Sequence, residues 1–145
     1  MRVLFDNDVV LDLLLRREPY HIEVKELFLR AAKREIVVFV SAITPINCFY
    51  IIRKEKDLAT AGEAVRKLLR IVGVSRVDKP ILDNAFSLGF SDFEDAVQCS
   101  SAMKTKLDAI ITRNIKDFTN SPIATYTPAD FLEFLGTQEE ISLGP

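Results

Sequence analysis

The sequence contains few of the residues that build disulfide frameworks or zinc sites, with only two cysteines and one histidine in 145 residues. Cys48 and Cys99 both lie in segments with the hydrophobic periodicity of helices. This placement predicts small residues at the edge of a core and not a disulfide framework. A single histidine, His21, argues against a Cys/His zinc site.

Long hydrophobic runs are also missing. No apolar run approaches the ~20 residues that a membrane-spanning helix needs. The charged residue Asp6 comes too early in the chain for a signal peptide. We therefore expect a soluble, cytoplasmic protein with no membrane association.

Charge of one sign does not dominate, since the formal net charge is −2. A polyanionic partner would need a local basic patch, because the overall field does not attract one. Of the residues, 48% are hydrophobic and 28% are charged, which fits one compact domain. No linker, repeat or low-complexity stretch interrupts it, and we expect a single domain over residues 1–135 with a C-terminal tail over 136–145, where no pattern is visible.

Hydrophobic patterns predict alternating strands and helices. Strands are expected at 2–5, 36–42, 73–77, 107–112 and 122–126. Helices are expected from residue 7 to about 16, over 20–34, from 44 to about 54, over 60–72, from about 79, over 91–104 and from 127. The expected N-terminal caps are Thr44 before Pro45, Thr60 with Glu63, Asp78 before Pro80, Ser91 with Glu94, and Thr127 before Pro128. This alternation predicts an α/β fold, a three-layer sandwich with a central parallel sheet covered on both faces.

Acidic and amide residues follow the predicted strands at the edge where such folds place their sites. Asp6 ends the first strand, Asp95 lies in the first turn of the 91–104 helix with Asp92 on the same face, and Asn114 and Asp117 follow the fourth strand. Carboxylates that converge repel one another, so a shared cation is expected between them. Mg²⁺ and Mn²⁺ prefer such hard oxygen ligands and can support phosphodiester hydrolysis.

Each acid also has a structural interpretation. An Asp in the first turn of a helix is favoured by the helix dipole, which applies to Asp92 and Asp95. Asp117 is also typical of a turn. We expect Asp8 to be a capping or outer-shell residue, and Asp12 to lie on the surface of the first helix. Asp6 has no such explanation, because it closes a buried strand without an obvious partner.

Four separated motifs resemble the PIN domain family, in particular small prokaryotic PIN proteins related to VapC toxins. The motifs are "LFDNDVVLDLLLRRE", "VSAITPINCFYIIRK", "DFEDAVQCSSA" and "DAIITRNIKDF", followed by the "TPADFLEFL" segment. The resemblance implies about five parallel strands and a Mg²⁺- or Mn²⁺-dependent endoribonuclease acting on RNA. It also implies a toxin held inactive by a small antitoxin protein, often as a homodimer.

The resemblance carries over to individual positions. Asp6 and Asp95 match family carboxylates, and Asn114 matches a position that is Asp or Asn, with Asp117 close behind it. The resemblance thus implies Asp6, Asp95 and Asn114 as metal ligands, with Asp117 in the catalytic set. Thr112 matches a small hydroxyl residue and, with Asp92, is a candidate supporting residue.

One position departs from the family pattern. Where the family usually has Glu on the helix after the second strand, this chain has Asn47. An amide can contact a metal or orient water, but it adds no charge and cannot act as a general base. Asn47 is therefore either a supporting site residue or a polar residue of the first helical turn, and it favours a second hypothesis, a PIN-like module that binds RNA or protein without cutting.

Two further interpretations concern basic residues and the first motif. Basic residues near helix ends and loops form a candidate RNA-binding rim, in which Arg113 and Lys116 flank the acids; the others are Arg16, Arg17, Arg53, Lys54, Lys56, Lys104 and Lys106. The stretch "FDNDVV" also matches the opening of haloacid-dehalogenase phosphatases. Such an enzyme would use Asp6 as nucleophile and would need a later lysine in the site.

Overall fold

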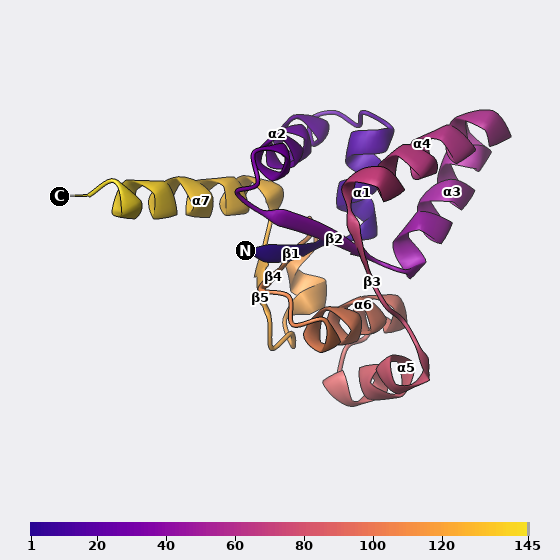
Figure 1. Ribbon diagram of the computed structural model, residues 1–145. Helices are drawn as coiled ribbons and strands as arrows, with labels where there is room; N and C mark the ends of the chain where they lie inside the picture. The colour runs from indigo at the N-terminus through magenta and orange to yellow at the C-terminus, as the bar shows by residue number, and fades with distance from the viewer. Residues whose placement is uncertain (145) are drawn as a thin grey trace.

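A five-stranded, all-parallel sheet forms the centre of the computed structural model, which describes residues 1–144. The strand order is β3-β2-β1-β4-β5, so β1 lies in the middle (Figure 1). The strands are β1 (Arg2–Phe5), β2 (Val37–Ser41), β3 (Gly73–Ser75), β4 (Ala109–Ile111) and β5 (Ala124–Tyr126). The α/β fold with about five parallel strands is confirmed.

Helices cover both faces of this sheet and make three layers (Figure 1). The helices are α1 (Asn7–Leu14), α2 (His21–Ala32), α3 (Ile43–Glu55), α4 (Leu58–Ile71), α5 (Lys79–Ala85), α6 (Phe93–Lys104) and α7 (Pro128–Ser142), with short 3-10 turns η1 (Phe86–Leu88) and η2 (Ile115–Phe118). No helix within residues 1–144 combines the length and apolarity that crossing a membrane requires.

Successive side chains of the central strand point to opposite faces of the sheet, which explains why helices pack on both faces. Val3 and Phe5 of β1 point into a core shared with α1 to α4 and the start of α7, whereas Leu4 points to the opposite face and packs against Cys99 of α6. Both faces are buried, which is why the strands read as continuous apolar runs in the sequence. Cys48 and Cys99 are free and buried, as expected.

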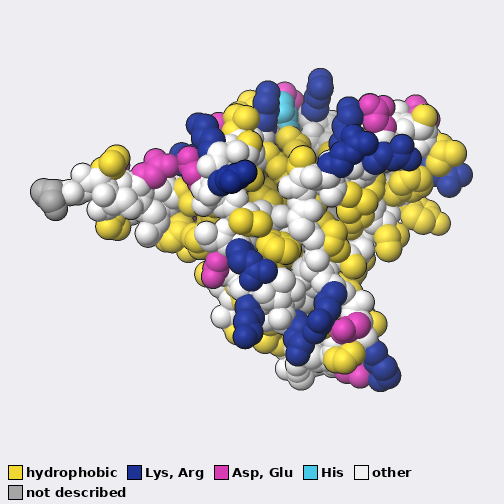
Figure 2. Space-filling view, viewed as in Figure 1, with side chains coloured by type: hydrophobic (Ala, Val, Ile, Leu, Met, Phe, Trp, Pro, Cys, Tyr) yellow, Lys and Arg dark blue, Asp and Glu magenta, His cyan; other side chains and the backbone are white. Residues whose placement is uncertain are grey.

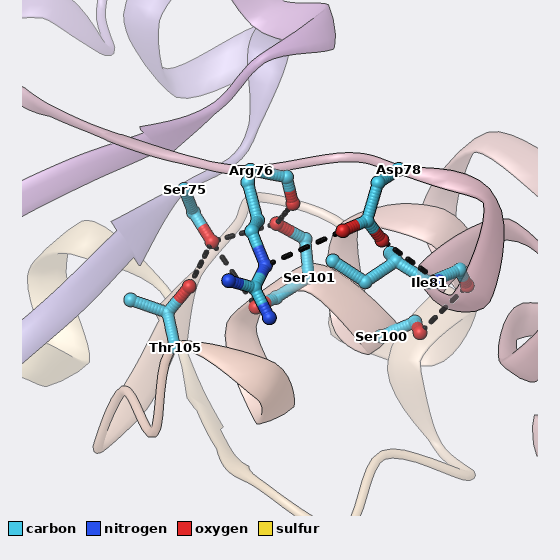
Figure 3. Close-up of polar contacts among 7 residues, drawn as sticks. All are labelled: Ser75, Arg76, Asp78, Ile81, Ser100, Ser101 and Thr105. Atoms are coloured by element: carbon cyan, nitrogen blue, oxygen red, sulfur yellow. Dashed lines mark hydrogen bonds and ion pairs between the residues drawn. The ribbon is translucent and has the colours of Figure 1, made fainter.

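A cluster of hydroxyl groups holds α6 against β3 and α5 (Figure 3). The Ser75 hydroxyl, at the end of β3, lies 2.6 Å from the hydroxyl oxygens of Ser101 in α6 and of Thr105, which follows the last residue of α6. Ser100 of α6 donates to the backbone carbonyl of Ile81 in α5, at 2.8 Å. These contacts fix where the C-terminal half of α6 lies relative to the sheet.

Helix starts differ from the expected caps at three places. Asp57 caps α4 by accepting from the Thr60 amide, and Asp92 caps α6 by accepting from the Asp95 amide, so Thr60 and Ser91 are not the caps. Helix α3 begins at Ile43 without a side-chain cap, and Thr44 is buried inside its first turn. The predicted caps Asp78 and Thr127 are confirmed.

Helix α7 continues past residue 135 to Ser142, although the sequence shows no pattern from residue 136. Its second half projects away from the other helices (Figure 1). Residues 136–144 of the expected tail are thus mostly helical, and residue 145 lies outside the described part of the chain.

Candidate active site

Asp6 occupies the position where the central strand passes into α1. It caps this helix and is 5% exposed. Its Oδ1 accepts from the Asn7 amide and from Nε2 of the buried Gln98, both at 2.7 Å. Its Oδ2 accepts from the Thr112 hydroxyl at 2.9 Å. Burial raises the pKa of Asp6 despite these donors.

The segment after β4 reaches Asp6 through Thr112, as the order of the sheet requires. The Thr112 hydroxyl oxygen also accepts from the backbone amide of Asn114, at 3.0 Å. The Asn114 side chain donates through Nδ2 to Oδ2 of Asp8, at 3.1 Å. Asp8 therefore does not cap the helix, a role that belongs to Asp6, and it contributes a carboxylate beside Asn114.

Asp95 brings a second carboxylate from the first turn of α6. Its pKa is raised to about 7 by burial and by the negative charges of Asp6, Asp92, Asp117 and Glu94. A distant carboxylate would not raise the pKa of Asp95. The raised pKa therefore reflects how closely the four acids lie to Asp95. Neither Asp6 nor Asp95 forms an ion pair with a base within residues 1–144.

An open cleft of about 450 Å³ collects these residues. It is lined by Asp6, Asn7, Asp8, Leu11, Asn47, Tyr50, Ile51, Asp92, Glu94, Asp95, Asn114 and Asp117. The predicted residues from four separate segments are therefore brought together in one cleft. No Lys or Arg is among these lining residues.

Glu94 is a cleft residue that the sequence analysis interpreted differently, as the partner of Ser91 in a helix cap. Its Oε1 instead accepts a hydrogen bond from Nδ2 of Asn7. Burial and neighbouring carboxylates raise the pKa of Glu94, and a side-chain hydrogen bond with Asn47 opposes this rise. The "FEDA" motif held the relevant signal, because it places two acids side by side in the first turn of α6.

Asp12 is not on the surface of α1, contrary to the expectation. Its side chain is fully buried, and Oδ2 lies 2.8 Å from Nε of Arg113 in an ion pair. Arg113 also stacks over the ring of Tyr20, 4.0 Å from its centroid. Arg17 approaches Oδ1 of Asp12 at 3.9 Å. The Arg113 guanidinium is thus held between an acid and an aromatic ring.

The other basic residues do not gather into a single patch on the face shown in Figure 2. Lys and Arg side chains are scattered there above and below the sheet, with hydrophobic side chains exposed between them. Lys116, in η2 close to Asn114, is exposed and forms no ion pair within residues 1–144.

The cleft fits a hard divalent cation by the chemistry of its donors. Among residues 1–144, no three His, Cys, Asp or Glu side chains form a ready-made metal-binding group. Mg²⁺ nevertheless needs only one or two protein carboxylates, because it keeps several of its waters. The cleft offers carboxylate and amide oxygens, and its excess negative charge is not balanced by a base. Asp6, Asp95 and Asn114 are the residues that would hold such an ion.

Several solved structures share this fold. The chain superposes with a TM-score of 0.69 on DNA-bound VapBC from Salmonella typhimurium, at 15% identity over 88% of this chain and 98% of that one. A toxin–antitoxin complex from Klebsiella pneumoniae gives a TM-score of 0.65 at 24% identity, over 87% and 97% of the two chains. VapC20 of Mycobacterium tuberculosis, a toxin that cleaves the sarcin-ricin loop, gives 0.61 at 16% identity, over 74% and 86%.

Sequence comparison identifies the family directly. A search of curated proteins returned no match. The family model described as "PIN domain" matches residues 2–116, which include every residue of the cleft except Asp117. The fold, the acidic cleft and this match agree, and the chain belongs to the PIN domain family.

Proposed function

We propose that the protein is a metal-dependent endoribonuclease that hydrolyses RNA phosphodiester bonds, and that it acts as the toxin of a toxin–antitoxin pair. The main support is the cleft, in which carboxylates from α1, α6 and η2 lie close together and no Lys or Arg is among the lining residues. Burial and this crowding raise the pKa of Asp95 to about 7. A site with this charge is stabilised by a cation.

The residues of the cleft have separate roles in this proposal. When bound, Mg²⁺ or Mn²⁺ neutralises charge and lowers the pKa of a bound water toward neutrality. Asp6 is the most rigid ligand, because Gln98 and Thr112 fix its two oxygens. Asp95 is the second ligand, and Asn114 and Asp117 support the ion or orient the attacking water.

RNA contacts come from the rim in this proposal. Lys116 contacts a phosphate in this proposal, which is supported by its exposure and by its position two residues after Asn114. Arg113 acts mainly as a positioning residue, because its guanidinium is held by Asp12 and Tyr20. A Lys116→Gln variant is expected to weaken RNA binding uniformly across sequences and to lower its salt dependence.

The decisive experiment is incubation of purified protein with structured and unstructured RNAs in Mn²⁺, Mg²⁺ or EDTA. The proposal expects cleavage with either metal, none in EDTA, and none by the Asp6→Asn/Asp95→Asn double variant. Glu133→Gln, an exposed change on α7, is the matched control and is expected to cleave like the unmodified protein. Cleavage in EDTA or by the double variant would contradict the proposal.

Asn47 favours one alternative, a PIN-like module that binds RNA or protein without cutting. In the same experiment, this alternative expects RNA binding without cleavage in either metal. The phosphatase alternative fits less well, because no lysine lines the cleft. It would be recognised by an aspartyl-phosphate trapped on Asp6.

The toxin role also implies protein partners, a small antitoxin and a second copy of this chain. Support comes from the solved complexes that share the fold. Expression of the chain alone is expected to arrest growth, and co-expression of a small protein encoded beside its gene is expected to relieve the arrest. Light scattering of the purified chain tests the homodimer.

A further inference from the structure

The family resemblance implies a carboxylate on α3 that this chain does not have, since Asn47 occupies that position. The Asn47 amide faces the acidic cleft and contributes no charge to it. A cleft that lost one carboxylate and gained nothing would hold a divalent cation more weakly, because affinity depends on the number of charged ligands. The question is therefore whether another residue carries the missing charge.

Glu94 lies where that charge is needed. It is in the first turn of α6, one residue before Asp95, and it lines the same cleft as Asn47. The Asn47 side chain lines the cleft beside it and is near enough to oppose the rise in the Glu94 pKa. Asp6 and Asp95 are both near enough to be coupled to it by charge.

A chain of polar contacts sets the orientation of Glu94. The Thr44 hydroxyl donates to Oδ1 of Asn7, which turns Nδ2 of Asn7 toward Oε1 of Glu94. Thr44 and Asn7 are both buried, so this arrangement is fixed from inside the protein. The Asn7 amide holds the carboxylate in place without neutralising it, and no base pairs with Glu94 within residues 1–144.

We propose that Glu94 supplies from α6 the negative charge that Asn47 cannot supply from α3, and that this charge strengthens the binding of the divalent cation held by Asp6 and Asp95. The inference rests on the proposed function, because that function provides the cation. The departure from the family pattern at residue 47 is then a relocation of charge and not its loss.

Moving the carboxylate back tests this inference. Mn²⁺ binding is measured by titration calorimetry without RNA for the unmodified protein, Glu94→Gln, and the double variant Asn47→Glu/Glu94→Gln. Glutamine keeps an oxygen that can accept from Asn7, so Glu94→Gln removes charge and little else. We expect Glu94→Gln to weaken Mn²⁺ binding about tenfold or more, as loss of a metal-site group does. We expect the double variant to bind within roughly threefold of the unmodified protein, because the charge count is restored.

Two controls separate the possible failures. Urea unfolding shows whether Glu94→Gln is folded, and Glu133→Gln is the matched loss of a surface carboxylate that should leave Mn²⁺ binding unchanged. If Asp6→Asn abolishes Mn²⁺ binding while Glu94→Gln does not weaken it, this inference is wrong and the proposed function stands. If the unmodified protein binds no Mn²⁺, the proposed function fails. If Glu94→Gln weakens Mn²⁺ binding and the added Asn47→Glu change does not restore it, the claim that Glu94 replaces a carboxylate at position 47 is wrong.

Discussion

Arg113 and Asp12 form an ion pair whose Nε and Oδ2 atoms are 2.8 Å apart, and this pair ties the loop after β4 to the middle of α1. A second contact joins Nη2 of Arg113 to Oδ1 of Asp12 at 3.3 Å. Asp12 is fully buried, whereas the Arg113 side chain is 26% exposed. The pair lies directly beside Asn114 and so helps to shape the cleft.

Removal of the charge on Asp12 is expected to destabilise the protein. Asp12→Asn leaves Arg113 without its buried partner and should lower the free energy of unfolding by about 3 kcal/mol, the lower end for broken buried pairs because Arg113 reaches solvent. Urea unfolding measures this. The control is Asp83→Asn, which breaks an exposed pair with Lys79 and should cost less than about 1 kcal/mol. Equal losses in both variants would show that burial of Asp12 does not matter.

Stability without metal is expected to fall as the pH rises. The pKa of Asp95 is raised from 3.8 to about 7, so the folded state binds a proton that the unfolded state releases. The resulting stability is fully present below pH 3.8 and is lost as the pH passes about 7. Asp95→Asn removes this dependence and should be more stable than the unmodified protein above pH 7, by on the order of 1 kcal/mol after solvent screening.

Unfolding in EDTA at several pH values between 4 and 8 tests the contribution of Asp95. Asp6 and Glu94 also have raised pKa values, so part of the slope remains in the Asp95→Asn variant. An unchanged slope in that variant would contradict the crowding of carboxylates around Asp95.

Metal binding is expected to release protons near neutral pH. A cation favours the ionised form of Asp95, whose pKa is about 7 without it. Mn²⁺ titrations at pH 6.5 in two buffers with different ionisation enthalpies measure the release. The same apparent binding enthalpy in both buffers would show that no proton leaves.

Thr112 is expected to act on the site through its hydroxyl. Thr112→Val removes the donor to Oδ2 of Asp6 and the acceptor for the Asn114 amide. We expect it to lose about 1–2 kcal/mol of stability and about tenfold in Mn²⁺ affinity. Thr112→Ser keeps the hydroxyl and is expected to keep most of the affinity. Equal metal binding by the two variants would exclude the hydroxyl from this role.

Both cysteines are expected to resist alkylation in the folded protein. Cys48 and Cys99 are fully buried, and burial raises both thiol pKa values, that of Cys48 to about 12. At pH 8, iodoacetamide should leave them unlabelled until urea unfolds the chain. Mass spectrometry reads the outcome, and labelling of either thiol before unfolding would contradict the packing of α3 or α6.

The strands were predictable from the sequence because they are buried on both faces. A parallel strand with helices on either side has a continuous apolar run, as in residues 2–5 and 109–111. The helix starts were less predictable. Ser91 and Asp92 are adjacent and cap equally well, so sequence alone does not choose between them. The end of α7 was missed because residues 137–142 are exposed and contact α2 through a polar pair, Glu139 with Arg30, so no hydrophobic period results.

The sequence predicted most of the acids that form the site, but it did not predict the side-chain contacts that those acids make. Asp6, Asp95, Asn114 and Asp117 line one cleft because parallel strands end at the same edge of the sheet. Asp12 was misplaced because its partner Arg113 is 101 residues away in the chain. Glu94 was misread because a capping box accounts for an acid at that position equally well.

The order of the strands means that the cleft can be completed only late in the synthesis of the chain. The central strand β1 pairs with β4, which is made about a hundred residues later, and Asp117 follows β4. A polypeptide still attached to the ribosome therefore lacks part of the cleft until most of the chain has been translated. If the proposed ribonuclease function holds, this delay would protect the translation machinery while the chain is being made.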